Sequence, residues 1–269
     1  MFYKTYRKGL CIPFVLFEIL FVIRPRLFIV YYAFTDNLGH FTFQAFTDFF
    51  SNRTKLNVLF VSLLIGLVTT IICRLIGFPI AWILAGSDFK SSSVFVRLFV
   101  IPRWINFVLR TGALRDLLNV VYGWFGKSTG ELPYLSAIIG LVADYLPFTI
   151  IPLHSTLLKL DHSQIEAAKD LGCNPFHTFT RSILPQARPG IISACRMVFR
   201  PTISSYVITD VMSERQLRLF GNSIETSFSN SDWEGGSFMA LIRLVIIFIT
   251  RLITKKFNDK SEKEGGGSW

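Results

Sequence analysis

Residues 166–185 read EAAKDLGCNPFHTFTRSILP and predict two short helices joined by a tight turn. Ser163, with Glu166 three residues later, forms the capping-box pattern that marks the start of a helix. Gly172 is expected to end this helix, because glycine adopts a left-handed backbone at a helix C-terminus without steric strain. The first helix is therefore predicted to begin just after Ser163 and to end at Gly172.

The second predicted helix follows the turn directly. Asn174-Pro175 begins it, since proline is tolerated in the first turn of a helix. Pro185 and Pro189 are expected to stop it before the next apolar stretch. A short helix with small surface residues can dock in the groove of a partner protein, and a docked loop between two membrane spans would move both spans. The alternative is an ordinary amphipathic helix at the membrane interface.

The composition around this segment indicates a membrane protein. Of the 269 residues, 51% are hydrophobic and 17% are charged, whereas soluble domains carry about 25% charged residues. The apolar residues come in blocks. The formal net charge of +10 fits lysines and arginines that collect at the cytoplasmic ends of membrane helices, so nucleic-acid binding is not favoured.

Six apolar blocks are long enough to cross a bilayer, which takes about 20 predominantly apolar residues. The sequence therefore predicts an all-α polytopic membrane protein. Lysine and arginine are more frequent in the flanks that include both termini and the loop 160–189, which predicts that these parts are cytoplasmic. We expect one transmembrane domain over residues 1–257 and a charged tail over 258–269, whose final GGGSW resembles a linker remnant. The expected spans are residues 10–34, 58–85, 94–110, 135–157, 191–212 and 238–254.

The quoted stretch resembles the EAA loop of the permeases of binding-protein-dependent ABC importers, the MetI-like family. Ser182 departs from the family pattern, which usually has isoleucine there. The likeness covers roughly residues 10–257 and is greatest to the B-type permease subunits of spermidine/putrescine importers, through stretches such as GFPIAW at 77–82, IPRWIN at 101–106 and SSYV at 204–207. The matching loop residues are Glu166, Ala167, Ala168, Gly172, Leu184 and Pro185.

The resemblance implies a type I ABC importer permease fold with six transmembrane helices, a pathway for polyamines, and a place in the bacterial inner membrane. It implies a heterodimer with a homologous permease subunit, two ATPase subunits and an external substrate-binding protein. The phosphate-binding pattern GxxxxGK[ST] does not occur in the chain, so ATP is expected on the ATPase subunits, and no enzyme activity, cofactor or metal is expected here. The residues implied in ATPase coupling are Glu166, Ala167, Ala168, Asp170, Gly172, Leu184 and Pro185.

Carboxylates and aromatic rings in the expected spans are the candidates for contact with the cargo. A polyamine is a flexible polycation, and its pathway needs carboxylates to replace lost hydration and aromatic faces to stabilise ammonium groups. Asp144 and Tyr145 are adjacent, whereas Tyr206 and Asp210 lie one helical turn apart. For each carboxylate the alternative role is an ion pair with a neighbouring arginine. The candidates are Asp144, Tyr145, Tyr206, Asp210 and Trp104.

Arginines within the expected spans do not fit a pathway for polycations. Each costs on the order of 2.5–3.5 kcal/mol at the centre of a membrane helix. The resemblance implies apolar residues, often methionine, at several of these positions, and the chain has four methionines. The arginines could line a water-filled cavity or pair with carboxylates such as Glu18, lie at membrane ends, or reflect a chain altered from its natural parent, which we favour. They are Arg24, Arg26, Arg74, Arg103, Arg196, Arg200 and Arg243.

Other function classes are less well matched by the sequence. A stand-alone secondary transporter or channel would usually show inverted repeats or matching broken helices, and we find neither. A membrane-embedded enzyme should show clusters of catalytic polar residues, and patterns such as GxSxG and HExxH are missing. An altered variant of the permease that no longer transports is the remaining alternative.

Overall fold

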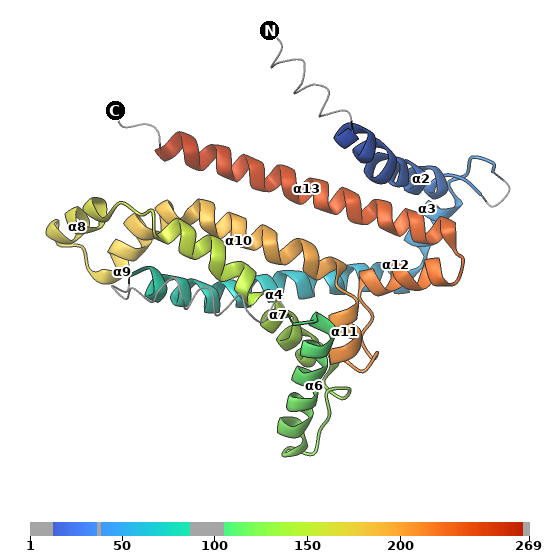
Figure 1. The fold of residues 1–269 in the computed structure, drawn as a ribbon, viewed down its shortest axis with the longest axis horizontal. Coiled ribbons are helices and arrows are strands. Elements are labelled where there is room, and N and C mark those ends of the chain that lie inside the picture. Colours follow the sequence, from blue (N-terminus) through green and yellow to red (C-terminus); the bar gives the residue numbers. More distant parts are fainter. Residues whose placement is uncertain (1–12, 37–38, 87–104, 266–269) are drawn as a thin grey trace, which may run out of the picture. The chain divides into compact units, whose positions relative to one another are not determined.

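The computed structural model describes residues 13–36, 39–86 and 105–265, and these ranges are almost entirely helical (Figure 1). The one pairing of extended backbone among them is an isolated bridge between Thr35 and Phe41. The chain forms two compact units. The first contains the described residues up to Asn57 together with Asn222–Phe248, and the second contains Val58–Gly221 and the described residues from Ile249. The prediction of an all-α fold is confirmed.

The first unit is held together by aromatic side chains. Its helices are η1 (Glu18–Ile23), α2 (Arg24–Ala33), α3 (Gln44–Ser51), most of α12 (Phe220–Ser229) and the first half of α13 (Trp233–Gly265). Ala45 and Phe49 lie one helical turn apart on the buried face of α3, which follows from the 3.6-residue helical period. Phe49 packs against Phe238 of α13, with ring centroids 5.7 Å apart.

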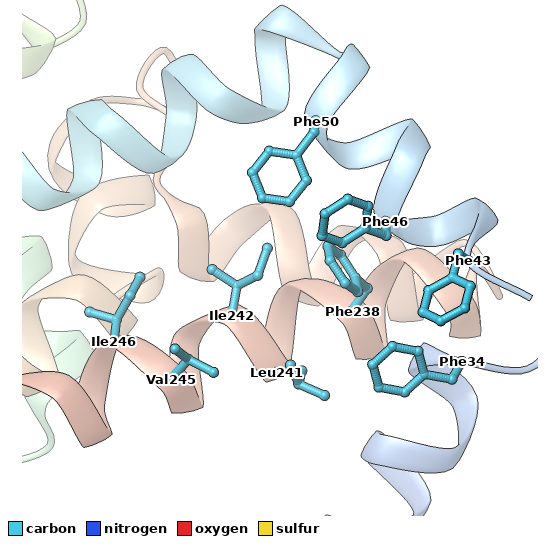
Figure 2. Close-up of a pocket in the computed structure, with 9 residues that line it drawn as sticks. All are labelled: Phe34, Phe43, Phe46, Phe50, Phe238, Leu241, Ile242, Val245 and Ile246. Carbon is cyan, nitrogen blue, oxygen red and sulfur yellow. The ribbon is translucent and has the colours of Figure 1, made fainter.

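An apolar groove of about 730 Å³ runs between these helices of the first unit (Figure 2). Phenylalanines from α3 and from the segment between α2 and α3 face one side of α13, and aliphatic side chains of α13 continue the groove. In a bilayer such a carbon-lined surface is compatible with lipid chains. The lining residues are Phe34, Phe43, Phe46, Phe50, Phe238, Leu241, Ile242, Val245 and Ile246.

The second unit is built on close helix packing. Its long helices are most of α4 (Arg53–Gly86), α6 (Phe107–Gly123), α7 (Pro133–Leu157) and α10 (Leu184–Ser204), followed by the short α11 (Val207–Met212). In Figure 1, α7 and α10 run side by side, and the two helices share an extensive contact. A Cβ atom at Gly190 of α10 would come within 2.6 Å of the Thr156 hydroxyl of α7. Small residues allow membrane helices to approach in this way.

Within the described part of the chain, three helices are long and apolar enough to cross a membrane: Arg53–Gly86, Pro133–Leu157 and Trp233–Lys256. They contain the expected spans 58–85, 135–157 and 238–254. The expected span 94–110 lies mostly outside the described residues. Within the expected span 10–34 the π-helix η1 runs into α2 without a break, whereas the expected span 191–212 is interrupted where the chain leaves the helix at Ser205, between α10 and α11. Six spans therefore stay a prediction.

Candidate coupling loop and pathway residues

The first helix of the loop is α8 (His162–Asp170), and Asp161 caps its N-terminus. The Asp161 carboxylate accepts hydrogen bonds from the Ser163 backbone N–H at 3.0 Å and from the Ser163 hydroxyl at 2.5 Å. These bonds lower the pKa of Asp161 from its usual value, and the bond from the Ser163 hydroxyl has the largest effect. The predicted capping box of Ser163 and Glu166 is wrong, because the aspartate two residues earlier takes the capping position and Ser163 lies in the first turn.

The C-terminus of α8 has the predicted glycine geometry. Gly172 has a φ of +79°, and its N–H bonds to the Lys169 carbonyl at 2.9 Å. The Cys173 N–H reaches back to the Ala168 carbonyl at 3.1 Å, which completes a Schellman motif. Space around Gly172 is open, so glycine is favoured here by its backbone conformation. The prediction that Gly172 ends the helix is confirmed.

The second part of the loop continues into the next long helix. Asn174 caps α9 (Pro175–Thr178) by accepting a hydrogen bond from the His177 N–H at 2.8 Å. The π-helix η3 (Phe179–Ile183) follows, and α10 begins at Leu184 without a break. The prediction that Pro185 and Pro189 stop this helix is wrong. Pro185 is the second residue of α10, which directly follows the π-helix η3, and Pro189 lies inside α10.

One face of α8 is anchored and the other is exposed. Ile165 is 7% exposed and belongs to the apolar cluster that includes Ile183 at the end of η3 and Ile191 of α10. Leu171 is 85% exposed and Phe176 is 71% exposed. The remaining candidate residues of α8 also face outward, and the half-buried Leu184 packs against the anchoring cluster. The exposed candidates of α8 are Glu166, Ala167 and Asp170, with Ala168 partly exposed and Gly172 exposed in the following turn.

The loop is also tied to α4. The Phe179 ring of η3 meets the Phe78 ring of α4 edge to face, with centroids 5.6 Å apart, and both side chains pack against the cluster around Ile165 and Ile183. Edge-to-face pairs are a preferred arrangement of aromatic rings. Movement of α8 and α9 would therefore reach both α10, through the continuous backbone, and α4, through this ring contact.

The pathway candidates on α7 face different neighbours. The carboxylate of Asp144 forms an ion pair with the guanidinium of Arg110 on α6. The alternative role considered for this carboxylate, pairing with an arginine, is therefore present in the structure. Tyr145 is 9% exposed and lies in an apolar cluster with Ile208 of α11. Asp144 and Tyr145 are thus adjacent in the chain, but Asp144 lies in an ion pair and Tyr145 lies in an apolar core.

The candidates on α11 have the predicted spacing. The Asp210 N–H donates to the Tyr206 carbonyl at 2.9 Å, so the two residues are one helical turn apart on the same face. Tyr206 is exposed and Asp210 is partly buried. Trp104 lies outside the described residues. A role of these residues in substrate passage stays a prediction.

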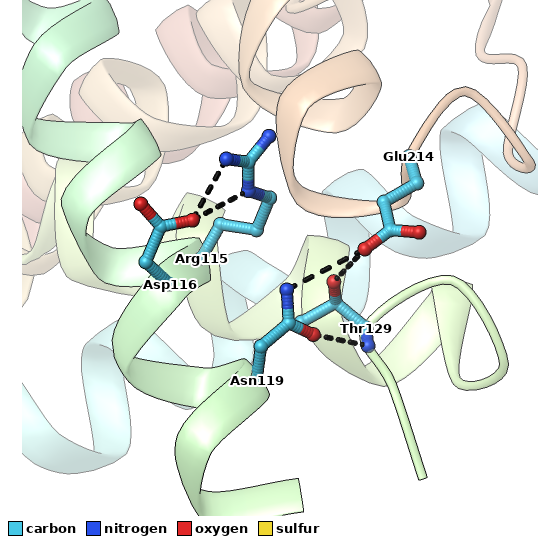
Figure 3. Close-up of polar contacts among 5 residues, drawn as sticks. All are labelled: Arg115, Asp116, Asn119, Thr129 and Glu214. Carbon is cyan, nitrogen blue, oxygen red and sulfur yellow. Dashed lines mark hydrogen bonds and ion pairs between the residues drawn. The ribbon is translucent and has the colours of Figure 1, made fainter. Parts of the chain in front are cut away.

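A polar cluster far from α8 was not predicted from the sequence (Figure 3). The Glu214 carboxylate accepts a hydrogen bond from the Thr129 hydroxyl at 2.9 Å and faces the Asn119 amide at 3.5 Å. The Asn119 side chain in turn accepts the Thr129 N–H at 2.8 Å. Glu214 has a φ of +50°, which is uncommon outside glycine. The cluster joins the α6–α7 and α11–α12 connections, and no local sequence pattern indicates contacts between residues so far apart.

A second polar contact lies beside this cluster. Arg115 donates two hydrogen bonds to the Asp116 carboxylate, at 2.7 and 3.0 Å (Figure 3). Both side chains are solvent-accessible, and such surface pairs contribute about 0–1 kcal/mol. Within the described part of the chain, no group of three histidine, cysteine, aspartate or glutamate side chains could hold a metal ion.

Comparison with known proteins identifies relatives along nearly the whole chain. Residues 77–263 match the family described as "Binding-protein-dependent transport system inner membrane component". The spermidine/putrescine transport system permease protein PotB of Escherichia coli is 34% identical over 264 residues, which cover 88% of this chain and 95% of that protein. PotB of Haemophilus influenzae is 34% identical over 268 residues, with 91% and 93% covered.

Solved structures with the same fold include a bacterial ABC transporter that imports the acidic polysaccharide alginate. It has a TM-score of 0.67 at 14% identity and covers 94% of this chain and 96% of its own. The alginate transporter in complex with a pentasaccharide-bound periplasmic protein has a TM-score of 0.71 at 13% identity, with 94% and 93% covered. At such identities the likeness supports the fold, and the family follows from the sequence match. The chain therefore belongs to the family of inner-membrane components of binding-protein-dependent transport systems and is a permease subunit of an ABC importer.

Proposed function

We propose that this permease carries polyamines such as spermidine and putrescine and that the loop of α8 and α9 is its docking surface for an ATPase subunit. The cargo is supported by the names of the relatives that are 34% identical over almost their full length. The docking role is supported by the exposed face of α8, with Leu171 and Phe176 as large apolar contacts. Exposed apolar side chains grouped with polar ones are typical of interaction sites.

The observation that carries the coupling role is the uninterrupted helical run from Pro175 to Ser204. At 1.5 Å per residue this run is about 45 Å long, so a force on α9 acts directly on α10. Ile165 holds α8 against the same end of α10, and the ring contact between Phe78 and Phe179 adds α4. In this proposal, closure of the ATPase moves α8 and α9 as one body and tilts α10 against its neighbours.

The remaining features of the proposed importer follow from this arrangement. The loop and both termini face the cytoplasm, where an ATPase is present, and residues 1–257 form the transmembrane domain with 258–269 as a tail. A homologous permease subunit completes a heterodimer, and two ATPase subunits bind the ATP, with no cofactor on this chain. An external binding protein delivers the cargo. A stand-alone transporter or channel is not favoured, because the matched family consists of components of binding-protein-dependent systems.

In this proposal an ammonium group of the cargo replaces an arginine as the ion-pair partner of a carboxylate in the pathway. Asp144 is ion-paired with Arg110, and an ammonium group of a polyamine would compete with that guanidinium for the carboxylate. Tyr145 next to it and Tyr206 with Asp210 on α11 would supply further aromatic and acidic contacts, and Trp104 a further aromatic face. Ionisable residues within membrane helices are the default candidates for such pathways.

The test is reconstitution of the complete complex in liposomes with the ATPase subunits and the binding protein. Spermidine should stimulate ATP hydrolysis and accumulate in the lumen. A variant that carries Leu171→Ala and Phe176→Ala should lose the ATPase subunits on purification, whereas Leu158→Ala, an exposed residue at the end of α7, should keep them. ATPase retention by the double variant would refute the docking surface, and stimulation by other solutes but not by polyamines would refute the cargo.

A further inference from the structure

Arg196 and Arg200 have surroundings that do not suit a charge. They lie one turn apart on α10 and line a groove of about 320 Å³ between α4, α10 and the second half of α13. The Nε atoms of both are buried and have no hydrogen-bond partner among the described residues. Neither arginine forms an ion pair within the described part of the chain, whereas Arg110 and Arg115 do.

The lining of this groove supplies no counter-charge. Thr70 donates its hydroxyl proton to the Gly66 carbonyl at 2.7 Å, and Thr254 donates to the Thr250 carbonyl at 2.6 Å, so these side chains are engaged within their own helices. Among the described residues that line the groove there is no carboxylate. Besides the arginines and threonines, it is lined by Leu67, Ile71, Cys195, Phe199 and Ile253.

The groove lies against a helix, α4, that is long and apolar enough to cross a membrane. Gly66 packs against Phe199, the residue before Arg200. Gly66 is about 20 Å from the first residue of α4 and about 30 Å from the last, at 1.5 Å per residue.

Methionine fits the buried part of these side chains. Arginine has Cβ, Cγ, Cδ and Nε before its guanidinium carbon, and methionine has Cβ, Cγ, Sδ and Cε. The unpartnered Nε of Arg196 and of Arg200 therefore takes the place of the terminal methyl of a methionine, which needs no partner. Methionine is unbranched and fills irregular apolar gaps, whereas a buried donor without an acceptor costs about 1–3 kcal/mol.

Three other arginines also stand in apolar stretches of the expected spans, although Arg24 and Arg74 are exposed. Arg243 is half-buried in the apolar stretch LIRLVIIF of α13, and Arg74 is exposed in CRLIGF of α4. The guanidinium of Arg24 lies 5.6 Å from the Phe28 ring centroid, a separation that a methionine sulfur also adopts toward aromatic rings. The chain has 27 phenylalanines but only four methionines, so the residue type that would fit these sites is scarce in it.

We propose that methionine occupies the positions of Arg196, Arg200, Arg243, Arg74 and Arg24 in the protein as its own cell makes it, because one codon that is conventionally read as arginine is decoded there as methionine. Arginine has several codons, and the proposal requires that these five positions share the reassigned codon while the ion-paired Arg110 and Arg115 use others. The inference does not depend on the cargo. Methionine at these positions removes positive charges that would oppose the passage of a polycation. The chain then need not have been altered from a natural parent.

The first test is mass spectrometry of the permease purified in its complex from the source cell. Peptides should carry methionine at positions 196, 200 and 243 and arginine at positions 110 and 115. Trypsin should therefore cut after residues 110 and 115 but not after residues 196, 200 and 243. Arginine at positions 196 and 200 in the native protein overturns the proposal.

The second test uses co-expression with the partner subunits in a host with the standard genetic code. A variant with Arg196→Met, Arg200→Met and Arg243→Met should be recovered in assembled complexes about tenfold or more above the arginine form, given the insertion cost of central arginines. The matched control is Arg110→Met, which leaves Asp144 without its partner and should lower recovery. If the triple variant loses the partner permease while the arginine form keeps it, the arginines pair with carboxylates of that partner, and the proposal is wrong.

Discussion

Ile165 anchors α8 to the body of the second unit, and its truncation should uncouple the permease from its ATPase. The side chain is 7% exposed and packs in the cluster that contains Ile183 and Leu160. Ile→Ala substitutions in cores cost about 2–5 kcal/mol. The lower end applies, because α8 is short and can relax into the space. A loss of about 2 kcal/mol raises the undocked fraction of α8 roughly thirtyfold, at 1.36 kcal/mol per factor of ten.

The assay separates docking of α8 from binding of the ATPase. Hydrogen exchange of the amides in α8 should accelerate roughly thirtyfold in Ile165→Ala if exchange follows local opening, while amides in the middle of α7 stay unchanged. In reconstituted complexes, substrate-stimulated transport should fall more than the amount of bound ATPase, because the exposed face of α8 is intact. Leu171→Ala is the matched control, since Leu171 is 85% exposed and its loss should weaken ATPase binding without faster exchange.

Two results would refute this reasoning. Unchanged exchange in Ile165→Ala would mean that the cluster does not hold α8. Faster exchange with full transport would mean that a docked α8 is not needed to move α10, and the continuous backbone from Pro175 to Ser204 would then be sufficient for coupling.

Three further predictions concern single residues. Gly172→Ala should destabilise the end of α8 by about 1–2 kcal/mol, because the φ of +79° is strained for alanine. The control is Gly112→Ala inside α6, where space is open and no destabilisation is expected. Thermal unfolding of the complex measures both variants, and equal effects would contradict the reasoning. The lowered pKa of Asp161 implies that its capping contribution is present above the unfolded-state pKa and is lost as the pH falls through the lower folded-state pKa. Asp161→Asn should therefore abolish this acid-dependent loosening of α8 in hydrogen exchange, and persistence of the effect would assign it to another group. Asp144→Asn should lower spermidine uptake without lowering the amount of assembled complex, and unchanged uptake in the transport assay would remove Asp144 from the pathway. Combining it with Arg110→Gln should relieve any unpaired charge but not restore uptake.

Local signals in the sequence were sufficient for the turn between α8 and α9. Gly172 ends α8 and Asn174 caps α9 because both effects depend on backbone conformation within a few residues. The capping box at Ser163 was wrong for the same local reason, since Asp161 also has a capping side chain and takes the position two residues earlier. Competition between neighbouring caps is not resolved by the pattern alone.

Long-range contacts were beyond reach of the sequence. The cluster of Glu214, Thr129 and Asn119 depends on two connections that meet only after α6, α7 and α11 have packed. The choice of Arg110 as the partner of Asp144 likewise depends on how α6 lies against α7. No periodicity or motif encodes such a pairing, because the residues are distant in the chain.

The sequence by itself determined that this chain is a helical membrane protein with a helix–turn–helix loop, since hydropathy and short-range capping act within single segments. Its resemblance to a known family identified the loop as the EAA loop of a permease. Only the tertiary structure decided that the loop continues into α10 as one helix, that Ile165 anchors α8, and that Arg196 and Arg200 have unpartnered donors in an apolar groove. The reason is physical: burial and the supply of hydrogen-bond and charge partners are properties of packed helices, and a side chain has them only once its neighbours from other segments are in place.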